Sequence, residues 1–257
     1  FPYTTLFRSL IAEIYGKISG SGSNLSDRLE DKLTGDIFGN LRYISFDRGM
    51  KQILMCCNNS SFIDEISLDY WADMIEFWPY DEEGELDFLL RLPNVTIGVE
   101  VKYLSGLSSD DNVRDSRKSK NQLARESRIL SKISKEDKTK PILLFIAQEP
   151  YAKEIYDNVI ERNIIEDGVE LAYISWEAIT IKMKELIIAK DLAVFEKLVL
   201  EDILTLLQRK GFEKFLNFHV NDIVEGNKYY TFDSDKKLIS FNNLDISIEG
   251  DKYYEFK

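Results

Sequence analysis

Histidine is the residue that this chain has least of. His219 is the single histidine among 257 residues. Zinc sites built from several imidazoles, histidine-metal nucleases and Ser-His-Asp hydrolases are therefore hard to build here. A lone histidine near the end of a predicted helix is typical of packing or surface. Any acid, base or metal chemistry must then rest on carboxylates and lysines.

Cysteines and long apolar runs are also scarce. The two cysteines, Cys56 and Cys57, are adjacent, which fits neither a disulfide framework nor a zinc-ligand spacing. This usage predicts buried thiols in a reducing compartment. The longest apolar runs, such as 142–147, fall far short of the roughly 20 residues that span a bilayer, and no charged-then-apolar leader opens the chain. We expect a soluble, cytoplasmic protein without a membrane partner.

Positive charge is in deficit. The chain has 33 Lys and Arg against 45 Asp and Glu, a net charge of −12, which argues against a protein that coats nucleic acid by bulk attraction. The sign reverses locally over residues 114–140. The candidate phosphate contacts in this tract are Arg114, Arg117, Lys118, Lys120 and Arg125. A solvated loop and helix face would explain the same charges equally well, and the polar stretch before Gln122 is the best candidate for a mobile loop.

The chain length allows one large domain with an appendage. Residues 1–9, "FPYTTLFRS", resemble a translated sequencing-adapter remnant and are expected to be non-native. We predict one main domain over 10–220. A small β-rich appendage over 221–257 is predicted from four short strand patterns separated by Asp, Asn and Gly.

Helical periodicity marks the start of the main domain. Apolar spacing predicts a helix over 10–18, and "SGSGSN" then interrupts the pattern. A second helix, capped by Asn24 or Ser26, is predicted from an i, i+4 stripe that Glu30 flanks. A further helical stretch is expected near 62–74, followed by a strand at "MIEFWPY" and a turn at "DEEGE".

The stretch "ELDFLLRLPNVTIGVEVKY", residues 85–103, predicts a hairpin of two alternating strands. A symmetric turn at Pro93-Asn94 pairs Leu92 with Val95. Counting outward then places Asp87 across from Glu100, and Glu85 across from Lys102. Proline cannot adopt the positive φ of primed hairpin turns, so a wider loop or a bulge remains an alternative.

Two opposed carboxylates on a sheet repel each other. Directly paired residues have Cβ atoms roughly 5 Å apart, and two full charges at that range repel by about 3 to 4 kcal/mol near a protein surface. A bridging Mg²⁺ would remove this penalty, since it prefers carboxylate ligands. An exposed hairpin with ordinary surface ion pairs is an equally good explanation from the pattern alone.

Three motifs in order resemble one known superfamily. "GELDFLL" and "GVEVKY", preceded by a helix with a glutamate and followed by the helix "NQLARESRIL", are similar to the PD-(D/E)xK nucleases. The sequence departs from that pattern because Leu86, not proline, precedes Asp87. The resemblance implies an α/β fold with a restriction-endonuclease-like core: a mixed central sheet flanked by helices in the order αβββαβ, with additional C-terminal helices and the small β appendage. The rest of the chain fits, with strands at "PILLFIAQ" and "ELAYIS", a helix between them, and helices over 177–215.

The resemblance also implies a function and a site. It implies a Mg²⁺-dependent deoxyribonuclease, with Mn²⁺ able to substitute, that acts on DNA in defence or repair, as a homodimer or within a larger assembly. The implied catalytic residues are Asp87, Glu100, Lys102, Glu30 and Gln122. The implied metal ligands are Asp87, Glu100, Glu30 and the carbonyl of Val101, with Asp31 or Asp36 as rivals to Glu30. Two alternatives are a catalytically silent nucleic-acid-binding or scaffold subunit, and an interaction protein whose charged hairpin is only surface.

Overall fold

The computed structural model describes residues 25–64, 66–189, 191–213, 230–233 and 238–241. The chain divides into two units, within 1–214 and within 215–257. The described part of the second unit is an antiparallel hairpin of β8 (Tyr230–Asp233) and β9 (Leu238–Phe241). Residues 1–9, the predicted helix over 10–18, His219 and the predicted boundary at 220 all lie outside the described residues.

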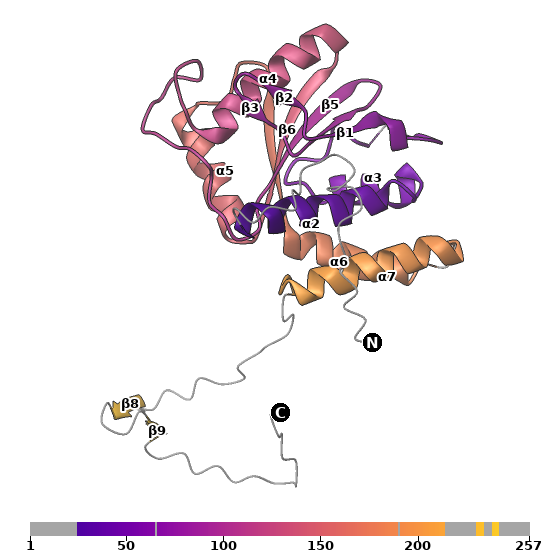
Figure 1. The fold of residues 1–257 in the computed structure, drawn as a ribbon, viewed down its shortest axis with the longest axis vertical. Helices are drawn as coiled ribbons and strands as arrows, with labels where there is room; N and C mark the ends of the chain where they lie inside the picture. The colour runs from indigo at the N-terminus through magenta and orange to yellow at the C-terminus, as the bar shows by residue number, and fades with distance from the viewer. Residues whose placement is uncertain (1–24, 65, 190, 214–229, 234–237, 242–257) are drawn as a thin grey trace. The chain divides into compact units, whose positions relative to one another are not determined.

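A five-stranded mixed sheet forms the centre of the first unit, as Figure 1 shows. Its strands, in sheet order, are β1 (Ile75–Phe77), β4 (Phe88–Arg91), β5 (Val95–Val101), β6 (Lys140–Ala147) and β7 (Glu170–Ser175). The first three are antiparallel, whereas β5, β6 and β7 are parallel. Every residue of β5 is buried, as expected for a strand covered on both faces. The predicted α/β class with a mixed sheet flanked by helices is confirmed.

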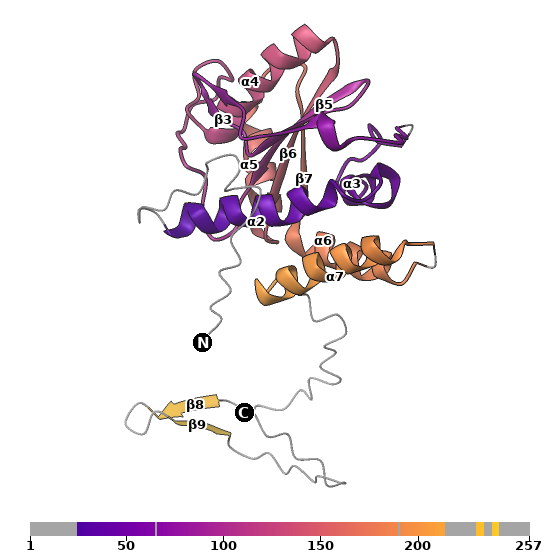
Figure 2. The same ribbon diagram turned by 45° about the vertical axis from the view of Figure 1, so that its right-hand side comes forward.

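Helices cover both faces of the sheet. One hydrophobic core includes residues of α2 (Leu25–Leu41), α3 (Met50–Leu54), α6 (Trp176–Ile187) and α7 (Val194–Arg209). The opposite core includes residues of α4 (Gln122–Asp137) and α5 (Tyr151–Arg162). Both views show α6 and α7 side by side on the α2 side (Figures 1 and 2). None of the described helices combines the length and apolarity that crossing a membrane requires.

Most predicted elements match this architecture. The strand expected near 75–80 is β1, and the "DEEGE" turn joins β2 (Tyr80–Asp81) to β3 (Gly84–Glu85). The strands and helices predicted after residue 140 correspond to β6, α5, β7, α6 and α7. Both cysteines are free, with Cys57 buried and Cys56 partly buried.

The helix predicted near 62–74 is wrong. This segment contains turns and one short 3-10 helix, η2 (Ala72–Met74). Ile63 and Ile66 still enter the core, but the backbone is held from outside the segment because Lys51 Nζ donates to the carbonyl of Ile66 at 2.5 Å. The indole of Trp71 likewise donates to Ile44 O at 2.8 Å. Apolar spacing alone could not reveal these distant partners.

The predicted register of the hairpin is confirmed over Phe88–Arg91, and the ladder ends before Asp87, whose amide donates to Val99 O. Phe88 pairs with Val99 and Arg91 with Thr96, and Leu92 N donates to Val95 O at 2.9 Å. The predicted pairing of Glu85 with Lys102 is wrong, since Glu85 pairs with Tyr80 in the β2–β3 hairpin. The alternation ends because Leu86 turns to the α4 side and packs over Gly98, where a Cβ would approach its Cδ1 to 3.3 Å.

Candidate active site

Lys102 lies at the centre of a buried ionic cluster at the end of β5. Its Nζ is 2.6 Å from Oε1 of Glu100 and 3.1 Å from Oε1 of Glu30. Its backbone is fixed on both sides, because the amide donates to Ile146 O and the carbonyl accepts from the indole of Trp176 at 2.8 Å. The lysine side chain is only 8% exposed. An ammonium group at this depth requires charged partners.

Glu30 reaches the cluster from α2. Its Oε2 accepts from the backbone amide of Tyr103 at 2.8 Å and from the hydroxyl of Ser105 at 2.6 Å. Helix α2 and the loop after β5 are thus joined by residues 72 positions apart. Of the three acids considered in this helix, Glu30 rather than Asp31 or Asp36 forms the ion pair with Lys102.

Asp87 completes the acidic face of the hairpin. Its Oδ2 accepts from the backbone amide of Val101 at 2.7 Å, and its own amide donates to Val99 O at 3.1 Å. Loss of hydration and then repulsion from Glu100 raise the pKa of Asp87 well above its usual range. Burial, followed by repulsion from Glu126, raises the pKa of Glu100 in the same way. The predicted proximity of Asp87 and Glu100 is therefore present, together with its electrostatic penalty.

Gln122 reaches the Glu100 carboxylate from α4. It opens α4, and the side chain of Asn121 caps this helix by accepting from the amides of Leu123 and Ala124. The amide nitrogen of Gln122 donates to Glu100 Oε1 at 2.5 Å, while its Oε1 accepts from Ser108 N at 2.8 Å. Gln122 therefore orients Glu100 and ties the loop to the start of α4.

Glu126 is the site residue that sequence reasoning missed. It lies one turn after Gln122, is 2% exposed, and lies against both Glu100 and Gln122. Burial raises the pKa of Glu126 to about 7, and no described residue forms a hydrogen bond with its Oε2. The i, i+4 spacing from Gln122 was a usable signal, but Glu126 counted only as a counter-charge in the basic tract.

The predicted phosphate contacts are not joined to this cluster. Among the described residues, no hydrogen bond or ion pair links the cluster to Arg114, Arg117, Lys118, Lys120 or Arg125. Arg125 instead donates to Ser109 Oγ at 3.1 Å and to the carbonyl of Glu83. Arg114 and Lys118 form exposed pairs with Glu161 and Asp115, and Arg117 and Lys120 are exposed.

The loop expected to be mobile is held by a second arginine that the sequence did not single out. Arg162 of α5, 10% exposed, lies 2.8 Å from Asp110 Oδ1 and 3.0 Å from Asp111 Oδ1. Asp110 in turn accepts from the side chain of Asn121 at 2.8 Å. This arrangement connects α5 to the cap of α4, and through it to Gln122.

The carboxylate oxygens of the cluster point to protein donors. Glu100 Oε1 contacts both Lys102 and Gln122, and Asp87 Oδ2 accepts from Val101. Within the described residues, no three or more His, Cys, Asp or Glu side chains are arranged as a metal-binding group. The cluster nevertheless contains four carboxyl groups and one ammonium. Lys102 contacts Glu30 and Glu100 and interacts electrostatically with Asp87 and Glu126. Acidic oxygens, the donor type that Mg²⁺ prefers, are therefore in excess.

Comparisons with known proteins add no relative: no family model, no curated protein and no solved structure matches the chain.

Proposed function

We propose that this protein is a Mg²⁺-dependent deoxyribonuclease that hydrolyses phosphodiester bonds on a restriction-endonuclease-like core. The observation that carries the proposal is the contact of Lys102 with both Glu30 and Glu100, at 3.1 and 2.6 Å. Three separate segments supply these residues and Gln122, and all converge at the end of β5. Surface ion pairs of an ordinary hairpin would not need this convergence.

The order of elements supports the finer fold proposal. A helix (α2), three antiparallel strands (β1, β4, β5), a helix (α4) and a parallel strand (β6) follow one another around the cluster. With α3, the two 3-10 helices and the β2–β3 hairpin set aside as insertions, this run is compatible with the order αβββαβ that the motif resemblance implies.

Acidic oxygens are the donor type that one or two Mg²⁺ ions would need here. Asp87, Glu100, Glu30 and the carbonyl of Val101 would hold the metal, and Mn²⁺ would substitute. A metal held there would supply a lowered pKa for a bound water molecule and would stabilise the negative charge that develops on the phosphate oxygens. Within the described residues, the buried Oε2 of Glu126 has no hydrogen-bond partner, so the cluster holds one acceptor oxygen that the protein leaves unused.

Lys102 would act as a fixed positive charge. Burial alone would lower the pKa of its ammonium, but the carboxylates of Glu100 and Glu30 outweigh this effect and raise the pKa. Lys102 therefore remains protonated and is unsuited to remove a proton from water. Its role would be to orient the attacking water or to stabilise charge on the phosphate oxygens, while Gln122 holds Glu100 in place.

One observation favours a second candidate, a catalytically silent nucleic-acid-binding or scaffold subunit. The carboxylates of Glu30 and Glu100 already have Lys102 as a partner, and Glu100 also accepts from Gln122. These contacts compete with a metal ion for the same oxygens. Such a protein would bind DNA without cleaving it.

The test is cleavage of plasmid, linear and single-stranded DNA by the purified full chain in Mg²⁺ or Mn²⁺, with chelator controls. Asp87→Ala and Lys102→Ala should reduce cleavage at least 100-fold. The matched surface variants Asp157→Ala and Lys153→Ala, which break an exposed pair on α5, should leave it unchanged. Binding without cleavage would favour the silent subunit, and cleavage insensitive to chelator would refute the proposal.

A further inference from the structure

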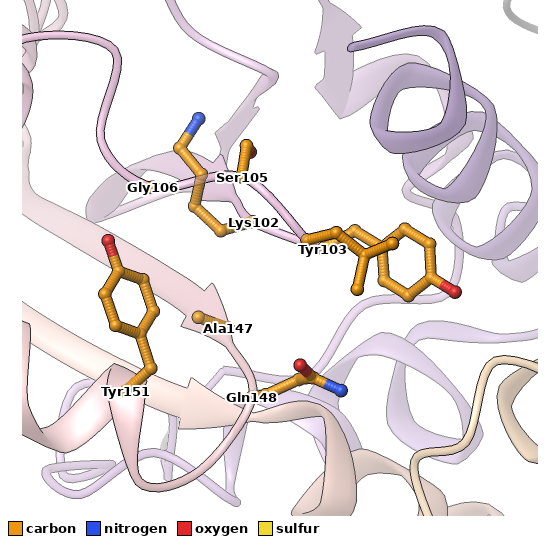
Figure 3. A pocket seen from close by; sticks show the side chains of 8 residues that line it. Lys102, Tyr103, Ser105, Gly106, Ala147, Gln148 and Tyr151 are labelled. Carbon is orange, nitrogen blue, oxygen red and sulfur yellow. The ribbon is translucent and has the colours of Figure 1, made fainter. Parts of the chain in front are cut away.

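A cavity of about 270 Å³ adjoins the ionic cluster. It lies where the parallel strands β5 and β6 end, and Lys102 forms part of its wall. Figure 3 shows Tyr151 and Tyr103 on opposite sides, with Ala147 and Gln148 between them. This volume is close to the lower end of the range for small-ligand sites, about 300 Å³, so the cavity suits one small group rather than a base pair.

The Tyr151 ring is fixed in position at one wall. Its hydroxyl accepts from the backbone amide of Leu107 at 3.2 Å, and Phe145 packs edge-on against the ring with centroids 6.2 Å apart. A fixed aromatic ring at the wall of a cavity is a stacking partner for a nucleobase.

The other walls offer hydrogen-bonding groups. The side-chain amide of Gln148 makes no hydrogen bond within the described part of the chain, so both its donors and its acceptor remain available. Gly106 brings backbone close to the cavity without a side chain, and a Cβ there would lie 3.6 Å from the Tyr151 hydroxyl. An amide beside an aromatic ring can bind the edge of an unpaired base.

The charge balance of the chain does not favour binding of a duplex along its backbone. Affinity for duplex phosphates comes from basic side chains that replace counterions. Arg128 is instead paired with Glu83 at 2.8 Å, and Arg162 with Asp110 and Asp111. The chain as a whole carries a net charge of −12. Recognition of a base would supply affinity that phosphate contacts here cannot.

We infer that this cavity binds one unpaired nucleoside next to the phosphate at Lys102, so that single-stranded DNA or a frayed end is the preferred substrate. This inference rests on the proposed nuclease function and adds its substrate class. The Tyr151 ring stacks on the base, and Gln148 hydrogen-bonds its edge.

The test measures binding with the full chain carrying Asp87→Asn, in Mg²⁺, so that no turnover interferes. The probes are a single-stranded oligonucleotide, the same strand with one abasic position moved along it, and the blunt duplex. We expect the single strand to bind at least tenfold more tightly than the duplex, and one abasic position to weaken binding about tenfold.

Two variants localise the effect to the cavity. Gly106→Leu fills it and should remove both preferences, whereas Asn112→Leu places the same side chain at an exposed site of the same loop and should preserve them. Gln148→Ala removes only a side-chain amide and serves as the test if Gly106→Leu does not fold. It should reduce the loss of affinity that an abasic position causes. Equal affinity for both DNA forms, or preferences that survive Gly106→Leu and Gln148→Ala, would overturn the inference while leaving the nuclease proposal intact. Absence of binding and cleavage for every DNA would overturn both.

Discussion

The ammonium of Lys102 lies 2.6 Å from one oxygen of Glu100, and both side chains are more than nine-tenths buried. Glu30, 3.1 Å away, makes this a three-residue ion cluster. A single buried cation thus compensates carboxylates from two separate parts of the chain, which makes the fold and the proposed chemistry depend on the same group.

Removal of this cation should destabilise the fold. Lys102→Met keeps the length of the side chain but leaves buried carboxylates without a partner, a change that typically costs about 3 to 5 kcal/mol. Lys153→Met, which breaks an exposed i, i+4 pair, should leave stability close to that of wild type, because solvent screens exposed ion pairs. Urea denaturation of both variants at pH 7.5 measures the difference. A loss for Lys102→Met no greater than for Lys153→Met would contradict the assignment of a buried ion cluster.

Glu126 should make stability decrease with rising pH. Burial raises its pKa from 4.5 to about 7, so the folded state holds its proton more tightly than the unfolded chain. Stability from this group is greatest below pH 4.5 and is lost as the pH rises through 7, a change on the order of 3 kcal/mol. Glu126→Gln removes this dependence, so its stability relative to wild type should increase between pH 4.5 and pH 8. The same difference in unfolding free energy between Glu126→Gln and wild type at both pH values would argue against a buried, protonated Glu126.

Arg162 should act as a positioning residue for Gln122. Arg162→Met removes charged hydrogen bonds from a buried guanidinium to Asp110 and Asp111. We expect faster amide hydrogen exchange across residues 108–121. We also expect slower DNA cleavage, because Gln122 would no longer be held in position. Arg114→Met, which removes an exposed pair with Glu161, is the control and should exchange as the wild type does. Unchanged exchange in Arg162→Met would show that other contacts hold the loop.

Gln122 itself can be tested without a large loss of stability. Gln122→Ala removes the donor to Glu100 and the acceptor for Ser108 N. We expect cleavage to fall at least tenfold at saturating DNA, with DNA affinity changed less than twofold, because the side chain orients Glu100 and does not bind substrate. A loss confined to affinity would instead place Gln122 in substrate binding.

Local pattern predicted the hairpin but not the contacts between segments. Strict alternation and Pro93-Asn94 specified the register of β4 against β5, because one face had to match the other. The same pattern failed at Leu86, where packing over Gly98 reverses the face. Distant partners similarly hold the 62–74 segment in a non-helical form, since Lys51 donates to the carbonyl of Ile66 and Trp71 donates to the carbonyl of Ile44. Alternation in the sequence predicts which side chains are buried. It does not predict which distant residue contacts them.

The site shows the same limit. Motif order was enough to single out Glu30 and Gln122, which the structure places against Lys102 and Glu100. Glu126 was not singled out because a buried carboxyl looks like surface charge within the charged tract 114–140, and Arg162 was not because it looks like an ordinary charge at the end of a helix. Only their burial in the folded chain distinguishes them from the exposed Arg114 and Lys118.

The most direct test of the central claim is titration calorimetry of Mg²⁺ into the full chain at pH 7.5, with wild type, Asp87→Asn and the exposed control Asp157→Asn compared. The account predicts saturable Mg²⁺ binding in wild type and in Asp157→Asn, and a loss of that binding of at least tenfold in affinity in Asp87→Asn. Equal Mg²⁺ affinity in all three proteins, or no saturable binding in wild type with or without DNA, would contradict it.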